Sequence, residues 1–94
     1  MDKCWIQKGD IHILLYTPYN DEEEFARIMW DADRDWICYS EPLQMEQTML
    51  DADTLEEAKE EIEQMARDLY VDEIAYYERL LNIFNEEPKE KNHE

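Results

Sequence analysis

The chain has 94 residues, the size of one domain, and 44% of them are hydrophobic, including three Trp and six Tyr. This excludes a chain that is disordered throughout, because disordered chains are poor in aromatic residues. The 26 acidic residues outnumber the nine Lys and Arg and give a formal net charge of −17, which disfavours direct binding to nucleic acid or to an anionic membrane surface and favours a strongly basic partner.

The first predicted element is a β-hairpin within residues 3–17. Two apolar stretches flank Gly9-Asp10, and glycine at the first central position suits a two-residue hairpin turn. In the second stretch, IHILLY at 11–16, both faces of the strand are apolar. This pattern predicts that the second strand lies inside a sheet and not at its edge.

Residues 18–24, PYNDEEE, predict a turn or loop that ends in four consecutive acids. A second hairpin follows, with strands over 25–31 and 36–41 and an acidic tip between them. Pro42 is expected to end its second strand, because proline cannot donate a hydrogen bond to the ladder. The segment 43–50 has no clear pattern, and a short strand near its C-terminal end is one option.

From Asp53 onward the spacing of apolar residues changes to that of a helix. The segment TLEE at 54–57 is a capping box, in which the Thr54 side chain caps the helix and Glu57 reaches back. An apolar stripe follows at three- and four-residue steps, made of Leu55, Ala58, Ile62, Met65, Ala66 and Leu69.

The stripe is interrupted at Glu73 and resumes in YYERLLNIF at 76–84. One unbroken helix over 54–86 would be about 50 Å long, longer than a domain of this size is wide. We therefore expect a bend or short break near 70–72, which leaves one helix or two. Residues 87–94 are a charged tail that we expect to be disordered.

These elements predict one α+β domain over residues 1–86. About four antiparallel strands in the N-terminal half form a sheet, and one or two C-terminal helices pack on one of its faces. The two cysteines, Cys4 and Cys38, are expected to be reduced and buried in strands. With no signal peptide and no apolar run long enough for a membrane span, the sequence predicts a cytoplasmic protein.

The alternating aspartates of DADRD at 31–35 raise the question of a calcium site. Position 6 of an EF-hand loop requires Gly and position 12 a bidentate Glu, but the sequence has Trp36 and Pro42 there. A Cys/His cluster for zinc is missing as well. We therefore expect no cofactor and no specific metal site, and at most weak cation association at the tip.

No arrangement of residue types predicts catalysis. His12 is the only histidine outside the tail and has no Ser or Cys partner motif. Gly9 is the only glycine, which excludes a glycine-rich phosphate loop. With 26 carboxylates some pair always lies close together, so none can be assigned to acid–base chemistry. We expect that the protein is not an enzyme.

The acids themselves are the main functional signal. Residues 21–63 contain 16 acids against three bases, a net charge of −13. In the helix, the pairs Glu56/Glu60 and Glu57/Glu61 each cost roughly 0.2–0.5 kcal/mol by repulsion one turn apart, which selection for stability alone would remove. The predicted partner-binding residues are Asp21, Glu22, Glu23, Glu24, Asp31, Asp33, Asp35, Glu56, Glu57, Glu60 and Glu61.

Two comparisons relate these acids to nucleic acid. If the tip stays extended, Asp31, Asp33 and Asp35 form a row with a spacing of about 6.6–7 Å. A compact domain of this length has a radius of gyration of about 12 Å and a width of about 30 Å, over which duplex DNA carries roughly 18 charges. The alternatives are a surface that mimics phosphates and a surface that is merely well solvated. Tyr19, Trp30 and Trp36 either anchor contacts near the acids or pack in the core.

In size, charge and organisation the whole chain resembles small phage-encoded inhibitors of bacterial defence, of the anti-CRISPR and anti-restriction DNA-mimic type. The segment DADTLEEAKEEIE at 51–63 also looks like the strand-to-helix junction of small phage and antitoxin-like α+β proteins. The resemblance implies an inhibitor in the host cytoplasm that occupies the basic nucleic-acid-binding groove of a defence nuclease, such as a CRISPR effector.

An alternative is an acidic interaction module, an antitoxin or adaptor, that binds a basic partner without mimicry. Homodimerisation through the amphipathic segment 76–84 is compatible with both functions.

Overall fold

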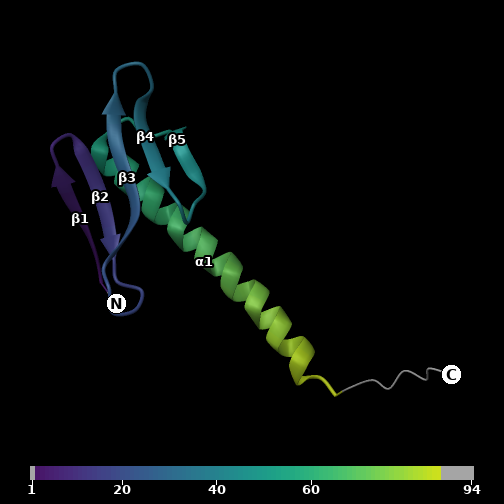
Figure 1. The fold of residues 1–94 in the computed structure, drawn as a ribbon. Coiled ribbons are helices and arrows are strands. Elements are labelled where there is room, and N and C mark those ends of the chain that lie inside the picture. Colours follow the sequence, from purple (N-terminus) through teal and green to yellow (C-terminus); the bar gives the residue numbers. More distant parts are fainter. Residues whose placement is uncertain (1, 88–94) are drawn as a thin grey trace.

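The computed structural model describes residues 2–87 and has the predicted α+β organisation, an antiparallel sheet followed by a helix (Figure 1). The elements are β1 (Lys3–Lys8), β2 (Ile11–Tyr16), β3 (Glu23–Asp31), β4 (Asp35–Ser40), β5 (Met45–Met49) and α1 (Leu55–Asn85). The strand order in the sheet, β1-β2-β3-β4-β5, is the order in the sequence. Each strand is therefore joined to its neighbour by a short connection.

The first hairpin forms as the sequence predicts. Gly9 has a φ of +60°, which the first central position of this turn requires and which glycine adopts without strain. β2 pairs with β1 on one side and β3 on the other. The prediction of an interior strand from its two apolar faces is confirmed.

The prediction of about four strands is one short, and the strand boundaries of the second hairpin differ, by two residues at the start of β3 and by one residue at each end of β4. β5 is the additional strand and pairs with β4; it lies in the segment 43–50, where a short strand near 47–50 was one option. Gln47, in its middle, has a φ of +51°, so the strand is irregular and shows no clean alternation of apolar residues. β3 begins at Glu23, so Glu23 and Glu24 belong to the ladder opposite Tyr16 and Leu15 and not to the preceding loop.

A bulge at Phe25 changes the alternation of β3. Leu14 pairs with Ala26 and Leu15 pairs with Glu24, so Phe25 is the extra residue of β3. As a result two successive residues are buried, Phe25 with 3% and Ala26 with 0% exposure. The Phe25 ring packs edge-on against Tyr16.

The first half of α1 covers one face of the sheet (Figure 1). The predicted cap forms, since the Thr54 hydroxyl accepts a hydrogen bond from the Glu57 N–H at 3.1 Å. Ala58 and Ile62 are the fully buried residues of the helix. The core between helix and sheet consists of Leu14, Phe25, Ala26, Ile28, Cys38, Leu50, Ala52, Ala58 and Ile62.

The opposite face of the sheet is also apolar. Ile13 and Ile37 are 6% and 2% exposed, although they are not part of the core beneath α1. Their cross-strand neighbours bury them. Ile37, for example, lies between Met29 and Met49.

The predicted bend near 70–72 is wrong, because α1 runs unbroken from Leu55 to Asn85. The helix contains no glycine or proline that would break it, and it extends beyond the sheet instead of folding back (Figure 1). Its 31 residues span about 46 Å. The radius of gyration is accordingly 19.1 Å, well above the roughly 12 Å of a compact chain.

Within residues 2–87, no helix combines the length and the apolar character needed to cross a membrane. The predicted disordered tail, 87–94, lies outside the described residues except for Glu87.

Candidate functional site

Nine of the eleven predicted partner-binding acids fall at two opposite ends of the sheet, and the other two, Glu60 and Glu61, lie in the second turn of α1. Successive connections of an up-and-down sheet alternate between its ends, so the β1–β2 turn, the β3–β4 turn and the start of α1 share one end (Figure 1). The β2–β3 connection, with Asp21 and Glu22, lies at the other. The predicted residues therefore do not form one continuous surface.

Eight carboxylates gather at the end that holds the start of α1. We call this surface the acidic end and define it as Asp10, Asp31, Asp33, Asp35, Asp51, Asp53, Glu56 and Glu57. The basic residues nearest to these carboxylates along the chain are Lys8, Arg34 and Lys59, and the Lys59 ammonium lies over the Trp5 ring. Sequence reasoning missed Asp10, Asp51 and Asp53 as site residues. The signal that could have found them is that each lies in a turn or loop at the same end of an up-and-down sheet.

The tip of the second hairpin is a turn, so the condition for an extended row of anions, that the tip stays extended, is not met. Asp31 and Asp35 are cross-strand partners, and the chain reverses direction through residues 32–34. The Asp31 carboxylate accepts a hydrogen bond from the Asp33 N–H at 2.8 Å and pairs with Arg34 at 3.3 Å. The hydrogen bond from the Asp33 backbone, followed by Arg34, lowers the pKa of Asp31. This carboxylate stabilises the turn.

Three other predicted residues also have structural partners. The Glu24 carboxylate accepts hydrogen bonds from Arg27, one of them 2.7 Å long, and these lower its pKa. Glu57 accepts the Asp53 N–H at 3.0 Å, and Glu61 accepts the Asp51 N–H at 3.0 and 3.2 Å. Glu57 and Glu61 therefore hold the β5–α1 loop against the helix, which explains two acids that repulsion alone would disfavour.

The remaining predicted residues have no hydrogen bond or ion pair from their carboxylates within residues 2–87. They are Asp21, Glu22, Glu23, Asp33, Asp35, Glu56 and Glu60. Three of them, Asp33, Asp35 and Glu56, belong to the acidic end. These three can be changed without removing a contact that holds the fold.

The aromatic residues considered as anchors differ in exposure. Trp30 is 57% exposed and precedes Asp31 at the acidic end. Trp36, its cross-strand partner, is half-buried and packs edge-on against His12. Tyr19 is 90% exposed but lies at the opposite end. Of the three, Trp30 is both exposed and adjacent to the acidic end.

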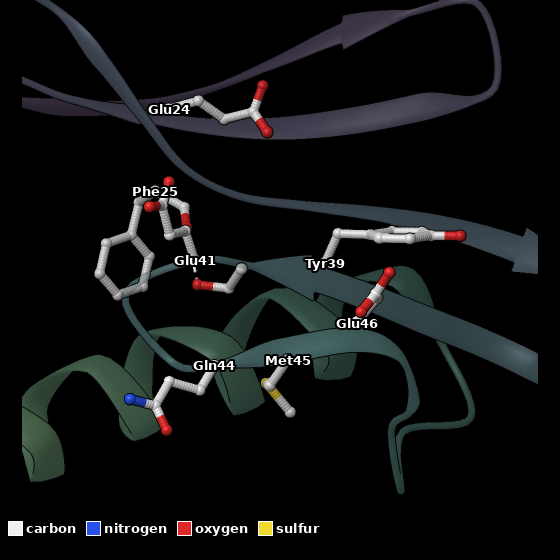
Figure 2. A pocket seen from close by; sticks show the side chains of 8 residues that line it. Glu24, Phe25, Tyr39, Glu41, Gln44, Met45 and Glu46 are labelled. Atoms are coloured by element: carbon white, nitrogen blue, oxygen red, sulfur yellow. Dashed lines mark hydrogen bonds between the residues drawn. The ribbon is translucent and has the colours of Figure 1, made fainter.

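A hollow of about 540 Å³ lies between β3, β4 and the start of β5, and Figure 2 shows its lining. Glu24, Glu41 and Glu46 contribute carboxylates, and those of Glu24 and Glu46 lie apart. The Ser40 hydroxyl donates to the Phe25 carbonyl at 2.7 Å and accepts the Leu43 N–H at 3.3 Å, so it has a structural role. In the part of the chain that the structure describes, no three His, Cys, Asp or Glu side chains are arranged to hold a metal ion.

The two cysteines differ in a way that the sequence does not indicate. Both lie in strands and neither forms a disulfide. Cys38 is buried beneath α1, as predicted, but Cys4 on the edge strand β1 is exposed, so the prediction that both are buried is wrong for Cys4. Burial raises the pKa of the Cys38 thiol to about 12.

Because exposed acids are in excess, we predict that salt raises the thermal stability of the protein. Raising NaCl from about 20 to about 500 mM shortens the Debye length from roughly 20 Å to about 4 Å, which screens the repulsion among carboxylates. We expect the Tm to rise by several degrees at a fixed low protein concentration, measured by circular dichroism. A fall in Tm would mean that exposed ion pairs such as Lys3–Glu63 outweigh the repulsion.

Comparisons with known proteins do not identify a function, so a functional proposal has to be based on the structure described above. No protein-family model matches this chain, and no curated protein or solved structure is significantly similar to it.

Proposed function

We propose that the protein is an inhibitor that binds the basic nucleic-acid-binding groove of a host defence nuclease, such as a CRISPR effector. It presents carboxylates where this groove binds phosphates, and so competes with the nucleic acid. The observation that carries the proposal is the acidic end, where separate turns and the start of α1 place eight carboxylates near three bases, Lys8, Arg34 and Lys59.

The position of the bases supports this function. Arg34 pairs with Asp31 and donates to the Gln47 side chain at 2.9 Å, so its guanidinium is engaged within the acidic end. A basic groove approaching this end meets carboxylates, and its attraction to them speeds association. Trp30, 57% exposed beside Asp31, adds an apolar contact of the kind found at interface hot spots.

The charge density supports mimicry of a single strand more than of a duplex. The shorter dimensions of the molecule are 31 and 20 Å, and one DNA strand carries one charge per about 3.4 Å, or about six to nine over such a width. The eight carboxylates of the acidic end are in this range. The net charge of the whole chain was compared above with the charge of a DNA duplex about 30 Å long. That comparison assumed a compact molecule and does not apply to this elongated one.

The test uses a variant in which three carboxylates of the acidic end without structural partners are neutralised: Asp33→Asn, Asp35→Asn and Glu56→Gln. Asn tolerates the φ of +59° at residue 35. Capture from a bacterial lysate, with and without nuclease treatment, identifies the effector. Displacement of fluorescent target DNA from that effector is then measured. We expect the variant to displace DNA at least about tenfold less well than the wild type at moderate salt, a loss of about 0.5 kcal/mol per carboxylate.

The matched control carries the same change in charge at the opposite end, as Asp21→Asn, Glu22→Gln and Glu23→Gln. It should stay within about twofold of the wild type. Equal losses in both variants would show that net charge, not the acidic end, determines binding, and would overturn the proposal.

A second candidate function is an acidic adaptor or antitoxin that binds a protein without mimicry. The observation that favours it is the projecting half of α1, which exposes large apolar side chains such as Tyr77 and Phe84. An adaptor forms a complex that excess DNA does not reverse, whereas a mimic is displaced by DNA. The same competition experiment therefore separates the two functions.

A further inference from the structure

The projecting half of α1 carries an exposed apolar seam, and within residues 2–87 the sheet contacts it at its first residue, where Tyr70 packs against Phe25. Its residues recur at alternating steps of four and three, the a/d spacing of a coiled-coil interface. They are 40% to 83% exposed, and we call them the C-terminal seam: Tyr70, Ile74, Tyr77, Leu81 and Phe84. The seam begins one turn after Ala66, which packs against the core.

A groove opens between α1 and the sheet where the seam begins. Its volume is about 620 Å³. The apolar part of the lining includes Leu14, Tyr16 and Phe25 from the sheet and Tyr70 and Ile74 from the helix. The charged residues of the lining are Asp2, Lys3, Glu63 and Arg67, and Lys3 pairs with Glu63. The groove and the seam thus form one continuous apolar surface, with Arg67 at the margin of the groove.

We propose that this surface binds a second copy of the chain and that the two α1 helices run antiparallel. The charges beside the seam determine the orientation. With Ile74 at position a and Tyr77 at d, Glu73 occupies g and Glu78 occupies e. In a parallel pair g meets e of the partner, so Glu73 and Glu78 would repel each other on both sides.

The antiparallel orientation removes these repulsive pairs. In that orientation g positions meet g and e positions meet e, so Glu73 lies near the partner's Leu80 and Glu78 near the partner's Val71. Tyr70 then lies opposite the partner's Leu81. The interface is the same on both copies and closes as a two-fold symmetric dimer.

This register also places charges of opposite sign together. Phe84 comes to lie beside the partner's Arg67, next to the groove. The C-terminus of α1 has Glu86 and Glu87 beyond it and no basic residue in its last turn. Its carbonyl groups and these acids are both negative, and the partner's Arg67 brings a positive charge next to them.

The apolar area that the seam and the groove can bury determines the affinity that we expect for the dimer. Aromatic side chains contribute about 150–250 Å² each when fully buried, so the exposed fractions of the five seam residues supply on the order of 500 Å² per copy. A standard interface buries about 800 Å² per partner, and the groove contributes part of the difference. We therefore expect micromolar dissociation, which salt tightens because both copies carry a charge of −17.

The first experiment compares two variants that differ in the side of the helix they change. Leu81 and Ile83 are 59% and 61% exposed, but they lie roughly 160° apart around α1, and Leu81 alone belongs to the seam. Sedimentation of the full chain between about 5 and 500 µM in high salt measures dimerisation. We expect Leu81→Asn to weaken the dimer at least about tenfold and Ile83→Asn to change it by less than about twofold.

Circular dichroism serves as the control, and we expect it to show that both variants keep the helix. A wild type that stays monomeric throughout this range overturns the proposal. Equal weakening by both variants does so as well, because the interface would then lie elsewhere.

The second experiment tests the orientation by disulfide formation in a Cys4→Ser background. Tyr70→Cys and Leu81→Cys are made in separate chains and oxidised alone and mixed. Eleven residues of helix separate the two positions by about 16 Å, beyond the roughly 7 Å that a disulfide can bridge. The antiparallel dimer predicts cross-linking in the mixture alone, and cross-linking of either single variant with itself would show a parallel pair.

Discussion

Ile62→Ala is expected to lower the free energy of unfolding by about 3 kcal/mol. Ile62 is 0% exposed, and together with Ala58 it is the fully buried part of α1. Its side chain packs in the core against the sheet. Truncation removes apolar contact and leaves a cavity between the helix and the sheet, where the long straight helix has little freedom to move inward.

Urea denaturation followed by circular dichroism measures this change. A loss of about 3 kcal/mol corresponds to a fall in Tm of roughly 12–24 °C for a domain of this size. The matched control is Ile83→Ala on the projecting half of the same helix, where Ile83 is 61% exposed, and it should cost less than about 0.5 kcal/mol. Similar losses in both variants would contradict the anchoring of α1 through Ile62.

The second large effect concerns the two thiols. In the folded protein, alkylation of Cys38 at pH 8 should be at least about a thousandfold slower than alkylation of Cys4. Cys38 is 0% exposed, and burial raises its pKa to about 12, so the thiolate is scarce and the reagent cannot reach it. Cys4 is exposed on β1. Mass spectrometry of the alkylated peptides resolves the two rates.

Two controls make the thiol measurement specific. In concentrated urea the rates of Cys4 and Cys38 should converge, because unfolding exposes both. In the Ile62→Ala variant the Cys38 rate should rise by about a hundredfold, the factor that corresponds to roughly 3 kcal/mol, if exposure requires unfolding. Comparable rates in the folded wild type would mean that α1 does not protect this face of the sheet.

The parts of the fold that depend on local chemistry could be predicted from the sequence. Gly9 specifies the first turn, and the Thr54 hydroxyl caps the helix. The parts that depend on context could not. The bend near 70–72 was inferred from the usual size of a compact domain, and no residue in α1 imposes it. β5 was difficult to predict because the positive φ of Gln47 disrupts its alternation.

The candidate site was predicted only in part, for a topological reason. Sequence reasoning found the acids of the second hairpin and of the first helical turns. The proximity of Asp10, Asp51 and Asp53 to them depends on which end of the sheet each connection occupies. The structural role of Glu61 depends on a contact with the Asp51 N–H, ten residues away. Such contacts between loop and helix leave no periodic signal in a sequence.

The order of strands in the sheet also bears on how the chain reaches its native state. Each strand pairs with the one made just before it, so β-sheet formation requires the closure of only short segments, which lowers the entropic barrier and favours rapid folding. During synthesis the whole sheet can assemble before α1 has emerged, and docking of the helix then completes the buried core.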